Sequence, residues 1–165
     1  MKTLEELKQE VLSEYDERVI ALAQHLGLDI DFEEKDFAIQ PDEKLTKEEV
    51  AEIEKEKQEA LNEAINDFRN ELDNIVEGYN NNMFSYYNED YLVLTDEEAD
   101  EEEDERLDNY IDECLEIPDN IRPYFDEEKW KRDARMDGRG HIISTYDGCE
   151  YEETVEGTTY YIYRV

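Results

Sequence analysis

The sequence predicts an α+β protein with long N-terminal helices, an acidic central helix and a small C-terminal antiparallel sheet. Apolar residues recur at steps of three and four over two long N-terminal stretches. Three Thr-x-x-Glu capping boxes precede helical patterns. Short β-rich runs near the C-terminus are separated by Asp-Gly and Glu-Gly turns. We therefore expect a helical N-terminal region over 1–80 and an α+β domain over 81–165.

The composition combines extreme acidity with a real core. The 165 residues include 50 Asp and Glu against 17 Lys and Arg, for a formal charge of −33. Such charge opposes compaction, but 38% hydrophobic residues and 12 tyrosines indicate a folded chain rather than a disordered acidic one. A cationic partner would explain the acidity. A solvated surface without a partner and halophilic adaptation are the alternatives.

The first predicted helix runs from Leu4 to Leu26 as one apolar stripe. Thr3 and Glu6 form its capping box, and Gly27 stands where a helix would stop. Residues 28–32 alternate like a short strand. The acidic residues there do not form a calcium loop, because the turn and bidentate positions lack Gly and Glu.

The second predicted helix covers 47–77, begins at the Thr46–Glu49 capping box and ends at Gly78. It would be about 45 Å long at 1.5 Å per residue. We expect it to pack on the first helix or on another chain. The tyrosine-rich segment 86–94 favours one or two short strands.

The segment 95–116 is the most acidic part of the chain. Nine of the ten residues from Asp96 to Glu105 are acidic. The Thr95–Glu98 pair is a third capping box, and Ile117-Pro118 ends the helical pattern. One face carries residues that can anchor the helix: Ala99, Glu103, Leu107, Tyr110, Ile111, Cys114 and Leu115. The sequence thus predicts an anchored acidic helix rather than a disordered tail.

Basic residues gather after this helix, with six of the 17 between Arg122 and Arg139. We expect them to pair with acids of the chain itself or of a second subunit. Asp126 can cap a short helix that ends near Gly138. The remaining residues predict strands from His141 onward, with hairpin turns at 147–148 and 156–157.

No pattern predicts catalysis, a metal or a cofactor. His25 and His141 lie in no metal-ligand motif, and Cys114 and Cys149 are too few for a zinc site or a disulfide framework. We therefore expect a protein that is not an enzyme. No apolar run approaches the roughly 20 residues of a membrane span, and the N-terminus lacks a signal core. We expect a soluble, cytoplasmic protein without membrane or direct nucleic-acid partners.

The density of negative charge suggests what the partner is. Residues 51–121 hold 25 acidic and 4 basic residues. A helix that is half carboxylate approaches the charge density of duplex DNA, about one charge per 1.7 Å. Such a rod could fill a basic nucleic-acid-binding groove of a protein. The candidate partner-binding residues lie in both acidic helices: Glu56, Glu59, Glu63, Asp67, Glu97, Glu98, Asp100, Glu101, Glu102, Glu103, Asp104, Glu105, Asp108 and Asp112.

The stretch IPDNIRPYFDEEKWKRDARMDG (117–138) resembles the C-terminal part of ArdA-type antirestriction proteins. The matching residues are an aromatic-Phe-Asp sequence before a helix with an aromatic and an Arg-Asp pair: Tyr124, Phe125, Asp126, Trp130, Arg132 and Asp133. The C-terminal half also looks like small acidic bacteriophage proteins. The N-terminal 80 residues depart from the family, which begins with a small β-rich domain. The resemblance implies an acidic DNA mimic that inhibits restriction enzymes, often as an elongated dimer.

Together these observations predict a non-enzymatic DNA mimic that inhibits a bacterial DNA-targeting defence complex. The target would be a restriction-modification enzyme or a CRISPR-Cas effector, whose basic groove the protein blocks in the host cytoplasm. A homodimer is one expected form. The alternative is an acidic phage accessory or adaptor protein that binds a protein target without DNA mimicry.

Overall fold

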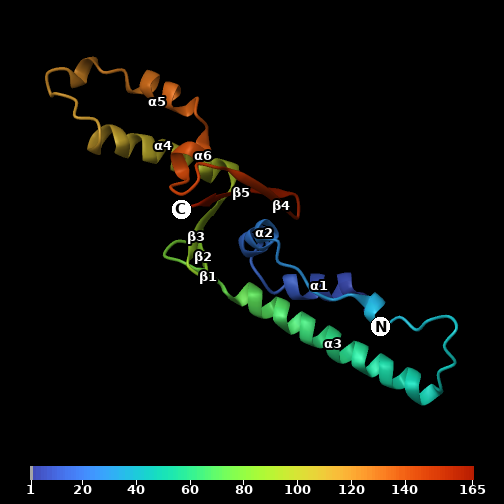
Figure 1. The fold of residues 1–165 in the computed structure, drawn as a ribbon. Helices are drawn as coiled ribbons and strands as arrows, with labels where there is room; N and C mark the ends of the chain where they lie inside the picture. The colour runs from blue at the N-terminus through green and yellow to red at the C-terminus, as the bar shows by residue number, and fades with distance from the viewer. Residues whose placement is uncertain (1) are drawn as a thin grey trace.

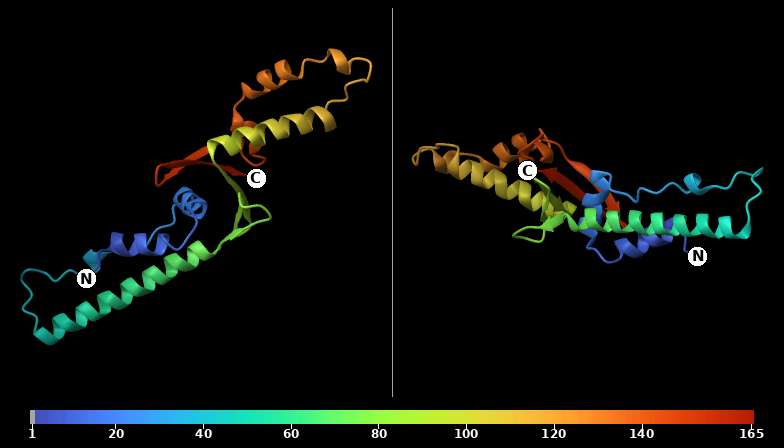
Figure 2. Two further views of the ribbon diagram at one scale, coloured as in Figure 1. Left: turned by 180° about the vertical axis from the view of Figure 1, so that it is seen from behind. Right: turned by 60° about the horizontal axis from the view of Figure 1, so that its bottom comes forward.

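The computed structural model describes residues 2–165 and confirms the α+β class. Over these residues the chain forms six α-helices, two short 3-10 helices and a five-stranded antiparallel sheet of order β1-β2-β3-β5-β4. The molecule is elongated (Figures 1 and 2). One end is formed by the long helix α3 with α1, and a two-helix arm of α4 and α5 projects from the opposite end.

The prediction of one continuous helix from Leu4 to Leu26 is wrong, because two separate helices occupy this range. α1 spans Leu4–Leu12 and α2 spans Glu17–Leu26. The side chain of Asp16 accepts a hydrogen bond from the backbone N–H of Arg18 at 2.9 Å, which caps a new helix. The Ser13 hydroxyl donates to the carbonyl of Glu10 at 2.6 Å. Asp and Ser side chains compete with helical backbone bonds in this way, so the apolar stripe continues across a break.

The break also has a tertiary cause. The Tyr15 hydroxyl donates to Asp73 on α3 at 2.7 Å, and Arg69 on α3 forms an ion pair with Glu14. Turning the chain here places α2 against the sheet while α1 stays beside α3. At the other end, Gly27 adopts φ +71°, so the predicted helix stop is confirmed.

The predicted strand at 28–32 is wrong. No strand lies between α2 and α3, and a 3-10 helix forms at Glu34–Phe37 instead. Leu28 and Phe32 pack against the main core as side chains, and no strand of the sheet pairs with this segment. The alternation of apolar residues over 28–32 therefore indicated which side chains are buried, but not that the segment pairs as a strand.

α3 spans Lys47–Asp73 and begins at the predicted Thr46–Glu49 capping box. It ends before the predicted position, because Ile75–Glu77 form the edge strand β1. β1 pairs with β2, which spans Met83–Tyr86, and β2 pairs with β3, which spans Glu89–Leu94. Two strands in the tyrosine-rich segment are thereby confirmed. The sheet takes β1 from within residues 1–80, so it crosses the predicted regional boundary.

The C-terminal hairpin joins β4, Tyr151–Val155, to β5, Thr158–Arg164. Glu156 and Gly157 form its turn with φ of 49° and 84°, as predicted. The prediction of a strand from His141 and a hairpin at 147–148 is wrong. Arg139–Ile143 form the short helix α6, and Gly140 lies so close to residues 148–150 that a Cβ there would be 2.7 Å from the carbonyl carbon of Cys149.

The arm comprises α4, Asp96–Glu113, and α5, Glu127–Arg135, joined through a 3-10 turn at Arg122–Tyr124. Both helices begin at the predicted caps. Helices cover both faces of the sheet. The main core joins Val93 and Ile162 to α2 and α3, whereas Leu92 and Tyr163, on the opposite face, pack near α4 and α6. The sheet thus fixes where both acidic helices project.

Candidate partner-binding surface on the acidic helices

The start of α4 is fixed to the rest of the protein through Arg18 of α2. Its guanidinium donates to both carboxylate oxygens of Glu98 at 2.8 Å and to the carbonyl of Val93 at 2.6 Å. Glu98 also accepts the backbone N–H of Thr95 at 2.9 Å in the capping box. Burial alone would raise the pKa of Glu98, but the bonds from Arg18 and Thr95 lower it below the ordinary value. The charge at this end of α4 therefore has a defined position.

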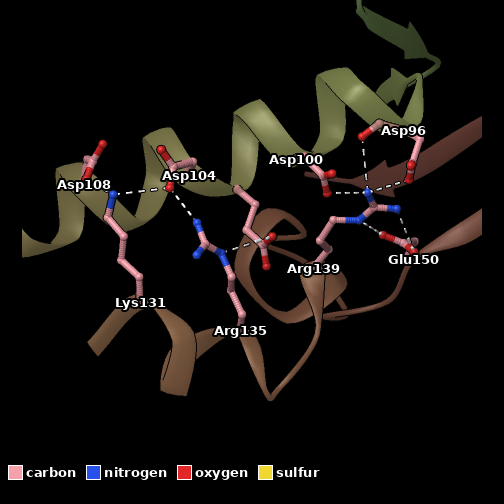
Figure 3. Close-up of polar contacts among 9 residues, drawn as sticks. Asp96, Asp100, Asp104, Asp108, Lys131, Arg135, Arg139 and Glu150 are labelled. Carbon is pink, nitrogen blue, oxygen red and sulfur yellow. Dashed lines mark hydrogen bonds and ion pairs between the residues drawn. The ribbon is translucent and has the colours of Figure 1, made fainter. Parts of the chain in front are cut away.

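A ladder of ion pairs joins α4 to the basic segment along one side of the arm (Figure 3). Arg139 contacts Asp96 and Asp100 at 2.8 Å each. Arg135 contacts Asp104 at 2.5 Å, and Lys131 contacts both Asp104, at 3.2 Å, and Asp108. We call these contacts the ion-pair ladder; its members are Asp96, Asp100, Asp104, Asp108, Lys131, Arg135 and Arg139.

The ladder follows from matched spacing on two antiparallel segments. The four aspartates recur every four residues and so share one face of α4. The three cations also recur every four residues, and they meet the aspartates in reverse order. Lys131 is 5% exposed although it is charged, and its bonds to Asp108 and Asp104 raise its pKa. The expectation that the basic cluster pairs with the chain's own acids agrees with these contacts.

A partly buried polar cluster closes the base of the arm. Arg139 donates from Nε to Glu150 at 2.9 Å, and Tyr163 donates its hydroxyl to the same carboxylate. Burial and the bond to Glu150 raise the pKa of Tyr163. Glu103 lies nearby at 6% exposure, with Arg135 at 3.7 Å, and burial raises its pKa. Glu103 is therefore an anchor of α4 and presents no charge to a partner.

Apart from Glu103, the structure divides the predicted α4 residues into three groups. Asp100, Asp104 and Asp108 belong to the ladder. Glu98, Glu102 and Asp112 pair with Arg18, Arg106 and Arg122. Three residues remain exposed without an ion pair within 4 Å among the described residues, and we call them the outer stripe: Glu97, Glu101 and Glu105.

The outer stripe has a regular geometry. Its members are four residues apart, so successive carboxylates are separated by about 6 Å along the helix axis. That rise is nearly two base-pair steps of DNA, about 3.4 Å each on one strand. Asn109 continues the same spacing without a charge. The stripe therefore offers three carboxylates along roughly one face of the first three turns.

A second acidic face runs along α3. Glu56, Glu59, Glu63 and Asp67 follow helical spacing and are exposed, while Leu61, Phe68 and Leu72 are buried on the other side. We call these four acids the α3 stripe. Among residues 2–165, the only cation within 4 Å of the α3 stripe is the exposed Lys55, which lies 3.7 Å from Glu59. Two other cations of α3 turn toward Glu34 and Glu14 instead.

A shallow groove extends the acidity of the α3 stripe. Glu63 and Asp67 line it from α3 together with Asp29 and Asp31 from the loop after α2. Asp29 is engaged by Lys8 at 2.7 Å, and its pKa is lowered chiefly by that contact. The carboxylates of the groove are thus drawn from two segments far apart in sequence.

The ladder lowers the net charge that α4 presents. The helix holds twelve acidic residues and one arginine. Arg18, Arg122 and the three ladder cations offset five of these charges, which leaves an excess of six. Over a helix of 18 residues, about 27 Å, duplex DNA would carry about 16 charges. The comparison of an isolated helix with DNA therefore overestimates the net charge of α4. The carboxylates of the outer stripe are the ones that stay available to a partner.

Other polar groups do not gather into a site. No group of three metal-ligating side chains that could hold an ion occurs in residues 2–165. Cys114 and Cys149 are exposed and not joined to each other. His25 packs on Tyr151 with ring centroids 4.6 Å apart, and burial lowers its pKa. None of the described helices is both long enough and apolar enough to span a bilayer.

No known family model, curated protein or solved structure matches this chain. The resemblance of residues 117–138 to antirestriction proteins therefore stays a prediction. Within that stretch the structure gives Asp126 the role of capping α5, where it accepts the N–H of Lys129 at 3.0 Å, and stacks Trp130 on Tyr110.

Proposed function

We propose that the protein is a non-enzymatic DNA mimic, which inhibits a bacterial DNA-targeting defence complex by filling its basic nucleic-acid-binding groove. The observation that carries the proposal is the pair of exposed acidic faces, the outer stripe of α4 and the α3 stripe, on helices fixed to one sheet. Their carboxylates are mostly free of the chain's own cations, although 17 cations are present.

Rigid placement supports mimicry over mere solubility. A solubilising surface needs charge but no fixed geometry. Here the chain uses Arg18, Lys131 and Arg139 to hold α4 in place, and these cations lie on faces other than the outer stripe. Charges fixed before binding lose little entropy when a partner binds, and this favours affinity.

The elongated shape also suits a groove (Figure 2). The two acidic helices project from opposite ends of the sheet, and the proposal needs a basic channel long enough to reach both. A restriction-modification enzyme is favoured by the resemblance of residues 117–138, and a CRISPR-Cas effector offers a comparable positively charged channel.

The test is displacement of a labelled duplex, followed by fluorescence anisotropy, from a type I restriction enzyme and from a Cas effector. We expect wild-type protein to displace the duplex from at least one of them at low salt, with affinity falling steeply as salt rises. Replacing Glu97, Glu101 and Glu105 with Gln should weaken displacement by roughly tenfold or more, if each exposed charge contributes about 0.5–1 kcal/mol.

A matched control removes three exposed charges elsewhere. Glu77 on β1 and Glu152 and Glu156 on the C-terminal hairpin are exposed and lie outside both acidic helices. Gln at these positions changes net charge by the same amount, so it should weaken displacement less than the outer-stripe variant. Equal effects from both sets would show that net charge and not a defined face drives binding. If the protein displaces the labelled duplex from neither enzyme, the proposal is wrong for these two targets.

A further inference from the structure

The side of the arm opposite the ion-pair ladder carries an apolar groove. It lies between α4 and α5, has a volume of about 390 Å³ and is lined in part by Leu107, Tyr110, Trp130, Ala134 and Ile142. Tyr110 and Trp130 stack with ring centroids 5.6 Å apart and an interplanar angle of 12°. Trp130 is the one tryptophan of the chain.

No element of the described chain covers this groove. The arm is only two helices thick, and α6 closes its base (Figure 1). The prediction that Tyr110 and Cys114 help to anchor α4 is wrong, because both are exposed, Tyr110 at 48%. The buried residues of α4 are Ala99, Glu103, Leu107 and Ile111. Tyr110 is thus about half-exposed and Trp130 is partly buried, and aromatic side chains that border a groove in this way are typical of binding hot spots.

The charge around the groove determines which occupant fits. Residues 96–139 contain 19 acidic and 7 basic residues. Arg106, which lines the groove, is already held by Glu102 at 2.7 Å, and Asp137 lies on the opposite wall. A second copy of the chain would bring another −33 charges against this arm and would be repelled.

We propose that the groove binds an apolar side chain presented by a basic segment of a protein partner. The aliphatic or aromatic group lies against Trp130 and Tyr110, while flanking Lys or Arg residues meet the acids of the arm. This inference rests on the proposed function for the basic character of the partner. It adds a contact that DNA does not make, and so gives the inhibitor a means to select one basic groove among many.

The test uses two synthetic peptides of equal length and charge, without tryptophan. Both are lysine-rich helix formers; one carries leucines at i, i+4 spacing and the other carries alanines at those positions. We expect the leucine peptide to bind roughly tenfold more tightly in calorimetry. It should also shift the emission of Trp130 to shorter wavelength, because its leucine excludes water from the ring.

Two variants locate the effect in the groove. Tyr110→Ala removes one wall, and Ala134→Arg fills the groove from α5; both should abolish the preference for leucine. Tyr124→Ala, which removes a side chain 86% exposed and outside the groove, should leave the preference unchanged. Circular dichroism confirms that each variant is folded.

Equal affinity for the two peptides would overturn the inference, as would a leucine preference that survives both groove variants. Either result would leave salt-dependent displacement of DNA intact. Conversely, failure of that displacement would remove the proposed function while a leucine preference still identified the groove as a binding site.

Discussion

The ion-pair ladder predicts a large difference between two arginines that both reach α4. Arg139 is 15% exposed at its side chain and contacts three carboxylates, of which Glu150 is 26% exposed. Arg122 makes one pair, with Asp112, and both side chains are at least 43% exposed. Arg139→Met and Arg122→Met keep the aliphatic stem and remove the guanidinium in each case.

The expected magnitude follows from burial. The pairs of Arg139 with exposed Asp96 and Asp100 contribute about 0.2–1 kcal/mol each. Its charge-assisted bond to the less exposed Glu150 contributes about 1.5 kcal/mol or more. The guanidinium also lies 4.5 Å from the Tyr161 ring centroid, a contact typically of about 0.5–1 kcal/mol. We therefore expect Arg139→Met to lower the free energy of unfolding by about 3 kcal/mol, and Arg122→Met by less than about 1 kcal/mol.

Thermal and urea unfolding followed by circular dichroism measure both. For a chain of this size, about 2–4 °C per kcal/mol gives a fall in Tm of about 6–12 °C for Arg139→Met and less than about 4 °C for Arg122→Met. Equal losses from the two variants, or no loss from Arg139→Met, would refute the reasoning that the base of the ladder holds the arm.

Three further outcomes are expected. Glu103→Gln should raise Tm at pH 7, because burial raises the pKa of Glu103 in the folded state above its ordinary value of 4.5, so that ionisation of this carboxyl group opposes folding. The gain in Tm over wild type should vanish as the pH falls below 4.5, where the carboxyl group is protonated in both states. A gain that persists at such pH would contradict this reasoning. Gly140→Ala should destabilise by about 1–3 kcal/mol in urea unfolding, since its Cβ would meet the backbone of Cys149, and unchanged stability would show that the loop yields freely. Leu72→Ala, at 0% exposure, should cost about 2–5 kcal/mol, whereas a cost below 1 kcal/mol would place α3 outside the cooperative core.

Helix starts were predictable because they depend on local chemistry. The Thr46–Glu49 and Thr95–Glu98 pairs each satisfy backbone N–H groups within four residues, and both caps form. The break between α1 and α2 was not predicted, since the apolar stripe of one helix continues into the next. The signal was present in Ser13 and Asp16, which favour turns and caps over helix interiors.

The sequence predicted which helices carry the negative charge, but not which of their carboxylates are exposed to a partner. Composition identified both acidic helices, yet it could not show that Asp104 and Asp108 face Lys131 while Glu101 faces outward. That division depends on α5 folding back antiparallel to α4. The repeated four-residue spacing of 131, 135 and 139 opposite 96, 100, 104 and 108 was a readable signal for it.

α6 was missed for a different reason. The segment after Gly138 is rich in β-branched and aromatic residues, which favour strands. The close approach of Gly140 to residues 148–150 is a tertiary contact that no local propensity reports. Tertiary packing decided the conformation of His141 and Ile143 there.

The proposed function requires that fixed carboxylates of this protein compete with DNA for one basic groove. The most direct measurement is the affinity of the protein for a restriction enzyme or Cas effector at increasing concentrations of unlabelled duplex and at several salt concentrations. Mimicry predicts that duplex DNA releases the protein in a saturable, competitive manner, and that affinity falls as salt rises, less steeply for the Glu97, Glu101 and Glu105 to Gln variant. A complex that forms but ignores both duplex DNA and salt would contradict the claim and would favour an adaptor that binds elsewhere on its partner.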